Sequence, residues 1–342
     1  MKRLICVMLS LTVFLSGCYQ IPAQQEEKQY TATFLNLFDT VTTIVGKAES
    51  KEAFEAEARQ VHDELLVYHQ LFDIYEEYDG IHNLKTVNDA AGGDPVKVDE
   101  KIIDLLTDCK VFYEATGGLV NVAMGSVLKL WHDARTEGIN NPQNARLPDE
   151  AALKAAADHT DMDKVVIDEA ASTVCLTDGE LRLDVGAVAK GWAVQKVAQE
   201  APEGLLISVG GNVCATGAKD AKGTPWVVGI QNPENSETYL HTIHVTEGSV
   251  VTSGDYQRAY AVEGKLYHHI IDPNTLYPSQ YWRSVTVVCP DSGVADALST
   301  ALFLLPQEEG QALLNRYSAE ALWVKASGER FYSPGFDALI RT

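Results

Sequence analysis

Apolar residues recur every three or four positions in several stretches of the chain, a spacing that predicts amphipathic helices. The two longest stretches are residues 49–72 and a second run that begins at Asp99. Asp99 is a good N-cap for the second helix, and Thr116-Gly117-Gly118 would end it in a glycine turn. Further helices are predicted at residues 149–158 and 188–199, and two more near the C-terminus.

Short runs rich in β-branched and aromatic residues predict strands between these helices. Residues 31–45 indicate a strand with a break near Asp39, and further strands are predicted at 165–167, 173–176, 181–183, 205–209, 284–288 and 322–324. Four runs, 226–231, 241–245, 250–252 and 259–262, suggest an antiparallel meander. Residues 73–95 are predicted to be irregular, and residues 133–148 to form an exposed loop. Because helices and strands alternate without a strict β-α-β order, the predicted fold class is α+β or mixed α/β.

The N-terminus has the pattern of an export signal. Lys2 and Arg3 precede an apolar run, residues 4–15, that is too short to span a bilayer comfortably. The run ends in Leu15-Ser16-Gly17-Cys18, which resembles the lipobox of bacterial lipoproteins. The resemblance implies a signal peptide at 1–17, a lipidated Cys18, a polar tether at 18–29 and an extracytoplasmic protein anchored to the bacterial membrane. An ordinary cleaved signal peptide is the alternative.

Charge and cysteine usage limit the possible partners further. The net charge is −21 and no basic stretch is present, which argues against nucleic-acid binding. The same charge disfavours adhesion to anionic lipid, so membrane contact would depend on the lipid anchor. Four cysteines follow Cys18 in apolar patterns without CxxC spacing, which favours buried free thiols: Cys109, Cys175, Cys214 and Cys289. One disulfide is the alternative, and its pairing cannot be derived from the sequence.

Three glycine-containing turns follow predicted strands. They lie at residues 183–191, 207–212 and 252–256, and the first carries Asp184 and Lys190 at its edges. A strand that turns into a helix at glycine directs backbone N–H groups at one point, which suits an anion. Each turn taken alone is equally consistent with an ordinary tight connection. Their convergence on one site is therefore a hypothesis.

Two polar features stand out in the C-terminal third. Asp296 and Thr300 are four residues apart in an apolar helical stretch, so their oxygens share one face. A carboxylate in such surroundings usually has a partner or a metal. Before this helix, His268 and His269 precede Asp272-Pro273 in a turn.

Five stretches, in order, together resemble the ApbE-type FAD:protein FMN transferases, a family of flavin transferases. They are residues 184–191, 208–212, 252–258, 269–278 and 294–301, with softer matches at Phe38-Asp39-Thr40, at Tyr75 and at residues 121–125. The resemblance covers about residues 30–342. It implies a single large ApbE-like domain in which antiparallel sheets are flanked by helices.

The resemblance also implies an activity. Members transfer FMN from FAD to a Ser or Thr of an exported acceptor protein, a redox protein, forming a phosphoester and releasing AMP in a Mg²⁺-dependent reaction. The implied metal ligands are Asp296, Thr300 and the backbone oxygen of Ala187. This agrees with the preference of Mg²⁺ for oxygen ligands and substrate phosphates.

The implied FAD-binding positions and catalytic groups also follow from the resemblance. FAD would contact Phe38, Tyr75, Ala123, Met124, Gly125, Asp184, Lys190 and Ile270. For the two aromatic residues, core packing is the alternative. His269 is the predicted base for the acceptor hydroxyl, since an imidazole can accept a proton near neutral pH, and Asp255 is the alternative base. His268 is expected to be structural or exposed.

The chain departs from the family pattern at four positions. Ala187 and Leu276 stand in place of glycines, and Asn121 and Asn212 stand in place of aspartates. Leu276 puts the local turn conformation in doubt, but no departure removes a proposed metal ligand or His269. The predicted function is therefore the transferase, with an FAD pyrophosphatase that yields FMN and AMP, or a non-catalytic flavin-binding lipoprotein, as alternatives.

Overall fold

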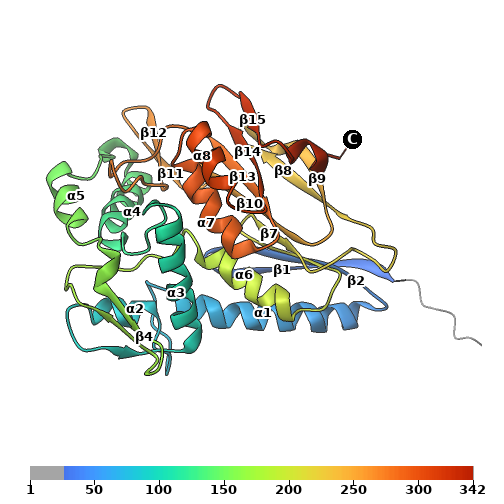
Figure 1. Cartoon of the computed structure of the whole chain (residues 1–342), viewed down its shortest axis with the longest axis horizontal. Helices are drawn as coiled ribbons and strands as arrows, with labels where there is room; N and C mark the ends of the chain where they lie inside the picture. The colour runs from blue at the N-terminus through green and yellow to red at the C-terminus, as the bar shows by residue number, and fades with distance from the viewer. Residues whose placement is uncertain (1–26, 342) are drawn as a thin grey trace, which may run out of the picture.

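The computed structural model describes residues 27–341, and an eight-stranded antiparallel sheet forms its centre (Figure 1). The strand order is β1-β2-β6-β7-β10-β13-β14-β15. The strands are β1 (Lys28–Leu37), β2 (Thr40–Ala48), β6 (Leu205–Val209), β7 (Asn212–Ala215), β10 (Gly248–Gly254), β13 (Ser284–Cys289), β14 (Glu320–Val324) and β15 (Arg330–Tyr332). Burial alternates along β6 and β2, as expected for strands whose two faces have different environments.

Helices cover one face of this sheet. They are α1 (Lys51–Phe72), α3 (Glu100–Ala115), α6 (Ala189–Glu200), α7 (Ser292–Phe303) and α8 (Gln307–Leu314). Ser50, Asp99 and Asp291 cap the first, second and fourth of these helices through their side-chain oxygens. The main hydrophobic core lies between these helices and the sheet, and α7 is buried along most of its length.

A β-hairpin covers part of the opposite face. It consists of β8 (Trp226–Asn232) and β9 (Asn235–Val245), and the short 3₁₀ helix η3 (Phe336–Leu339) packs beside it. Trp226, Ile243 and Phe336 form a second core with Leu322 from the large sheet. The two faces of the sheet are thus both buried in this region.

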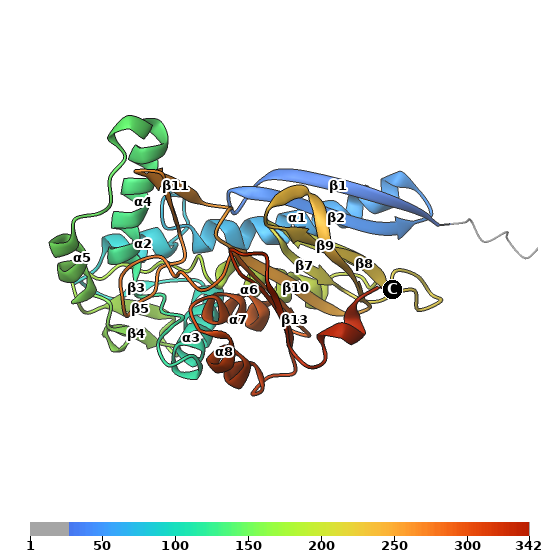
Figure 2. The ribbon, with the colours of Figure 1, turned by 90° about the horizontal axis from the view of Figure 1, so that it is seen from above.

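The remaining elements gather at the other end of the molecule, as the view from above shows (Figure 2). They are α2 (Leu84–Asp89), α4 (Gly125–Asn140), α5 (Glu150–Ala157), β3 (Val96–Lys97), β4 (Val165–Asp168), β5 (Thr173–Leu176), β11 (Ala259–Val262) and β12 (Lys265–His268), with the 3₁₀ turns η1 (Pro142–Asn144) and η2 (Met162–Lys164). A third core joins α4, α5 and the β11–β12 hairpin through Trp131, Leu153 and Tyr260.

The mixed fold class with antiparallel sheets and flanking helices is confirmed, and most predicted elements are present. Four predictions were wrong. Residues 133–148 are helical as far as Asn140, residues 181–183 form no strand, and the expected meander is divided among three sheets. Residues 73–95 also contain the helix α2. Within residues 27–341, no helix is both long and apolar enough to cross a membrane.

The predicted signal peptide at 1–17 and the lipidated Cys18 lie outside the described residues. The predicted tether at 18–29 is described only in its last residues, and β1 already begins at Lys28. The four later cysteines are free thiols. Three of them, Cys109, Cys214 and Cys289, are buried. Burial raises the pKa of these three thiols, which leaves them in the unreactive protonated form.

Candidate active site

Asp296 lies at the centre of the site, buried in the second turn of α7. Its Oδ2 accepts hydrogen bonds from the Gly191 backbone N–H (2.8 Å) and from Asn212 Nδ2 (2.9 Å), and Lys190 Nζ lies 3.9 Å away. Burial raises the pKa of the Asp296 carboxyl, while Lys190 and the two hydrogen bonds oppose that rise. The carboxylate is therefore held in place, but a further cation beside it would be favourable.

Three polar turns meet α7. The turn that enters α6 contributes Gly191, and the turn between β6 and β7 contributes Asn212, both bonded to Asp296. At the end of β10, Ser253 Oγ lies 2.8 Å from Ser299 Oγ of α7. The predicted convergence of the three glycine turns is thus observed, and α7 is the element that joins them.

Two glycines make this convergence possible. A Cβ at Gly191 would lie 2.3 Å from the Ser292 carbonyl oxygen and 2.4 Å from Asp296 Cβ, so only glycine lets α6 and α7 approach so closely. Gly210 has a φ of +56°, and a Cβ there would lie 2.7 Å from Thr40 Oγ1. Gly210 therefore brings the second turn against the start of β2.

The stretch from Asp184 to Lys190 is a hydrogen-bonded turn. The Gly186 N–H donates to Asp184 Oδ1 (2.9 Å), and Lys190 Nζ donates to the Gly186 carbonyl (3.2 Å). The Asp184 N–H in turn donates to the Val122 carbonyl (2.8 Å). Asp184 and Lys190, both predicted FAD-binding residues, are thus fixed on one short turn.

The predicted FAD-binding residues 123–125 run beside this turn. The Gly125 N–H donates to the Arg182 carbonyl (2.9 Å), and a Cβ at Gly125 would lie 2.4 Å from that oxygen. Ala123 and Met124 are buried. The structure therefore brings residues 123–125 and Asp184 together, as the sequence predicted.

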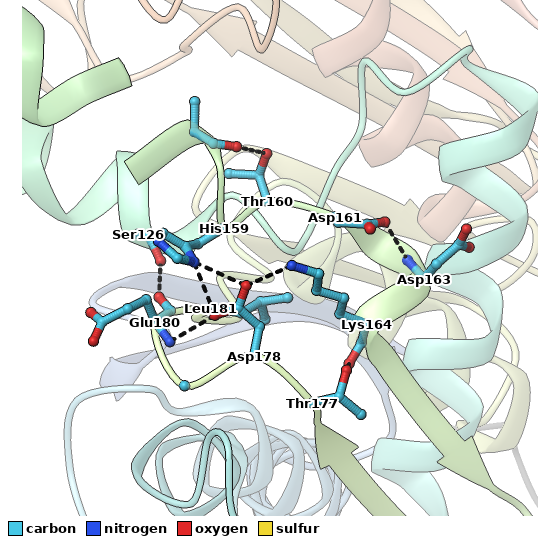
Figure 3. A network of polar contacts seen from close by, with 12 residues as sticks. Ser126, His159, Thr160, Asp161, Asp163, Lys164, Thr177, Asp178, Glu180 and Leu181 are labelled. Atoms are coloured by element: carbon cyan, nitrogen blue, oxygen red, sulfur yellow. Dashed lines mark hydrogen bonds and ion pairs between the residues drawn. The ribbon is translucent and has the colours of Figure 1, made fainter. Parts of the chain in front are cut away.

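A polar network around Asp178 supports this segment from behind (Figure 3). Lys164 Nζ lies 2.8 Å from Asp178 Oδ2, and His159 Nδ1 lies 2.9 Å from both carboxylate oxygens. The hydrogen bond from Lys164, followed by that from His159, holds the pKa of Asp178 well below its usual range. Ser126 Oγ also donates to the Glu180 carbonyl. The network thus connects Ser126, at the start of α4, to residues 178–180, shortly before Asp184.

The two histidines of the predicted turn have different environments. His268 is buried, with Nε2 2.7 Å from the Ser279 carbonyl, while its Nδ1 accepts from the Ile270 N–H (3.2 Å). His268 is therefore structural, and it also fixes Ile270. His269 Nδ1 is buried and has no hydrogen-bond partner among the described residues. Burial first, and then nearby cations, lower the pKa of His269 to about 3, which keeps its imidazole neutral.

Tyr75 lies beside His132 of α4, and Asp184 and two arginines influence its hydroxyl. The residue is 53% exposed, and the centre of its ring lies 5.4 Å from that of the His132 ring. Desolvation and then Asp184 raise the pKa of the Tyr75 hydroxyl to about 12, while Arg135 and Arg258 oppose the rise. An exposed aromatic ring beside charged groups is available to a planar ligand.

Phe38, the other predicted aromatic contact, lies in the β1–β2 turn. Its φ is +52°, its N–H donates to His69 Nδ1 (3.3 Å), and its ring meets the His69 ring edge-on. It also packs against the main core. The core-packing alternative therefore describes much of its surroundings.

Asp255, the alternative base, faces Arg283 at the end of β10. Its Oδ1 lies 4.0 Å from Arg283 Nε, and both atoms are buried without a hydrogen bond among residues 27–341. Burial raises the pKa of the Asp255 carboxyl and Arg283 opposes that rise. No hydrogen bond or ion pair in the described chain connects Asp255 with His269.

The predicted metal ligands lie on α7 and at the entry to α6. Asp296 Oδ1 and the Thr300 hydroxyl, one helical turn apart, make no hydrogen bond within the described residues, so both oxygens are available. Among residues 27–341, no group of three or more His, Cys, Asp or Glu side chains is placed to hold a metal. A metal here would therefore need hydroxyl, backbone or substrate oxygens besides Asp296, and a hard cation such as Mg²⁺ accepts such ligands. The donor set fits the prediction.

Sequence reasoning missed several polar residues of this site. Arg135 was assigned to an exposed loop and His132, just before that loop, was given no role. Asn212 was noted only as the end of a glycine turn and as a departure from the family pattern, and Arg258 only as the end of a motif. The available signal was the i, i+3 spacing of His132 and Arg135 directly after Trp131, which is typical of a helix. Two surface hollows along α1, near Gln60 and near Phe54, contain none of the site residues.

Comparisons with known proteins identify the family of the chain. Residues 38–323 match the model of the ApbE family. The FAD:protein FMN transferase of Treponema pallidum is 36% identical over 260 residues, 70% of each chain, and one from Klebsiella pneumoniae is 32% identical over 77% of this chain and 83% of its own. The crystal structure of an ApbE protein from Thermotoga maritima has a TM-score of 0.81 and 29% identity, covering 92% of this chain and all of its own. The chain belongs to the ApbE family.

Proposed function

We propose that this chain is a Mg²⁺-dependent FAD:protein FMN transferase. The observation that carries the proposal is the convergence of three polar turns on α7, two of them bonded to Asp296 and the third to Ser299, together with a neutral His269 whose buried Nδ1 has no partner among the described residues. The relatives named above bear that activity in their names. A buried nitrogen without a partner is costly in a purely structural role, which favours catalysis over flavin storage.

The proposed reaction is a phosphoryl transfer. The hydroxyl oxygen of an acceptor Ser or Thr forms a bond to the FMN phosphorus of FAD, and the bond from that phosphorus to the oxygen of AMP breaks. In this mechanism the hydroxyl proton passes to His269, whose imidazole is neutral, and the negative charge of bound FAD would raise its low pKa toward that of a more effective base. The products are a phosphoester-linked FMN, AMP and one proton, with no change of oxidation state. Water in place of the hydroxyl would give FMN and AMP.

Asp296 and Thr300 would hold Mg²⁺ through carboxylate and hydroxyl oxygens, with the Ala187 carbonyl as a further ligand. When bound, Mg²⁺ supplies positive charge to the diphosphate oxygens. The protein's own part is to keep Asp296 oriented through Gly191 and Asn212. Lys190 adds a positive charge on the same side.

The cellular setting is also part of the proposal. The lipobox-like sequence that ends at Cys18 supports export and lipid anchoring to the bacterial membrane. The acceptor would accordingly be an exported redox protein with a Ser or Thr acceptor site. A Cys18→Ser variant, expressed in a bacterium that carries the lipidation machinery, tests the anchor. We expect wild type in the membrane fraction and the variant released, and equal membrane retention would contradict it.

The activity is tested by incubating the purified chain with FAD, Mg²⁺ and a candidate acceptor protein. We expect a flavin-fluorescent acceptor band and one AMP released for each FMN attached. Free FMN and AMP without a labelled acceptor would identify a pyrophosphatase instead. Unchanged FAD would contradict both activities.

Two variants connect the result to the site. His269→Ala is expected to lower the transfer rate by about 100-fold or more, the range of general-base effects. His62→Ala serves as the matched control, since His62 lies on α1, packs against Phe34 and, among the described residues, bonds only to Asp63 and Asn36, none of which belongs to the site. Equal activity of the two variants would remove His269 from the mechanism.

A further inference from the structure

Two arginines near the site have no assigned role. Arg135 lies on α4, where its Nη2 is 3.1 Å from His132 Nδ1 and the His132 ring lies beside Tyr75. Arg258 immediately precedes β11. Gly138 of α4 packs so closely on Tyr260 of β11 that an added Cβ would lie 2.6 Å from the tyrosine ring. The elements that carry the two arginines are thus packed together.

The same region is tied to the His269 turn. Trp131 Nε1 donates to the Leu276 carbonyl (2.9 Å), which fixes α4 against the turn that follows His269. Arg135 and Arg258 each lower the pKa of His269, and Arg258 lowers that of Arg135. Both arginines also oppose the rise in the pKa of Tyr75. These electrostatic effects agree with the packing of α4 against β11 and against the turn after His269, which brings the segments that carry the two arginines into one region with Tyr75 and His269.

Neither guanidinium group is neutralised by the protein. Within residues 27–341, no salt bridge involves Arg135 or Arg258. The nearby acid Asp184 binds its own turn through Gly186. The chain has 48 acidic and 27 basic residues, so carboxylates are abundant elsewhere on it. Two neighbouring arginines left without a carboxylate in such a protein indicate a site for an anionic ligand.

We propose that Arg135 and Arg258 bind the diphosphate of FAD and then the phosphate of the leaving AMP. The inference rests on the proposed function. Transfer replaces a diphosphate carrying two negative charges with a phosphodiester carrying one, an AMP dianion and a proton. Negative charge therefore develops on the AMP phosphate, where a guanidinium group stabilises it through two parallel N–H donors. The arginines would act on the leaving group, while His269 acts on the attacking hydroxyl.

The test compares flavin binding with and without phosphate. FAD and riboflavin are titrated by fluorescence into the full chain, with EDTA present so that the arginines are measured without a metal. The variants are Arg135→Gln, Arg258→Gln and Arg135→Lys, and the control is Arg330→Gln on the edge strand β15. We expect each glutamine variant to weaken FAD binding by about 10-fold or more, since hydrogen bonds to charged groups contribute strongly. Riboflavin binding should not change.

Further readouts separate phosphate binding from a merely structural effect. AMP should compete with FAD less effectively in the glutamine variants than in wild type, and Arg135→Lys should retain part of the competition because it keeps the charge. The dependence of FAD affinity on salt should also become weaker. If Arg135→Gln does not fold, the Arg258→Gln and Arg135→Lys measurements still decide the question.

Two results would overturn the inference. If FAD affinity and AMP competition were the same in both glutamine variants as in wild type, the arginines would not contact the phosphate groups. Equal losses for FAD and riboflavin would show that they only shape the pocket. Failure of the proposed function gives a different result, because wild type itself would then label no acceptor, whether or not it binds FAD. Labelling by wild type with unaffected variants would overturn this inference alone.

Discussion

The substitution Gly191→Ala tests the close contact of α6 and α7 on which the site depends. The added Cβ would lie 2.3 Å from the Ser292 carbonyl oxygen and 2.4 Å from Asp296 Cβ. Non-bonded carbon atoms are at their optimum near about 3.5–4.0 Å, so the helices would have to separate by on the order of 1 Å. Because both obstructing atoms belong to, or lie next to, the backbone of α7, no side-chain rotation can relieve the clash.

The energetic consequences can be estimated from named contributions. Overpacking costs about 1–3 kcal/mol, and the higher helix propensity of alanine returns about 1 kcal/mol. Separation of the helices also weakens the bond from the Gly191 N–H to Asp296 Oδ2, and bonds to charged groups contribute about 1.5–3 kcal/mol. We therefore expect the variant to lose about 2–4 kcal/mol of unfolding free energy.

Urea unfolding followed by tryptophan fluorescence measures this loss, and Mg²⁺-dependent transfer measures the effect on the site. Gly310→Ala is the matched control. Gly310 lies inside α8, where an added Cβ would meet no atom closer than 3.4 Å. It should raise stability by about 0.5–1 kcal/mol through reduced unfolded-state entropy. A Gly191→Ala protein as stable and active as Gly310→Ala would refute the packing argument.

Three further predictions concern charge. Asp296→Asn should abolish Mg²⁺-dependent transfer and Mg²⁺ binding measured by calorimetry while leaving the fold intact; retained Mg²⁺ affinity would exclude Asp296 as a ligand. Asp178→Asn should lower Tm by a few degrees at pH 7. The pKa of Asp178 in the folded protein lies below its unfolded value of 3.8, so the difference in Tm from wild type should shrink as pH falls below about 4. A constant difference in Tm down to pH 3 would contradict this. In the free protein, NMR should show a His269 ring that stays neutral down to about pH 4, since its pKa is about 3; the unfolded chain takes up that proton near pH 6.5, so this residue should reduce stability as pH falls below about 6.5. Titration of the ring near pH 6.5 would be inconsistent with its burial.

The sequence was sufficient to locate much of the site. Local signals located the turn at Asp184 and Lys190, because a glycine and the start of a helix follow Asp184 within a few residues, although the strand predicted before the turn is absent. Asp296 was likewise identified from the sequence, because an acidic residue within an apolar helical stretch is a local pattern. Asn212, by contrast, bonds to Asp296 across 84 positions of sequence, and no local pattern indicates such a partner. Long-range partners of this kind become visible only in the fold.

Three of the four wrong fold predictions have the following physical reasons. The helix α4 continues through Asp133 to Asn140 because it needs only a narrow buried stripe, Trp131 and Gly138 among them, and its outward face is polar. Leu181 and Leu183 alternate as in a strand, but the Asn88 side-chain amide satisfies both backbone groups of Leu183 in place of a neighbouring strand. The four predicted strands form no single meander, because β10 pairs with the distant strands β7 and β13.

Leu276 shows how a departure from the family pattern is accommodated. The position favours glycine because its φ is +64°, a left-handed conformation that costs a leucine on the order of 1 kcal/mol. Its carbonyl accepts from Trp131 Nε1, and its side chain packs against the core formed by α4, α5 and β11. Contact of Leu276 with α4, the helix that carries His132 and Arg135, thus offsets the strain of its backbone. The same contact joins the His269 turn to α4, so this departure from the family motif lies between the proposed base and the proposed phosphate site.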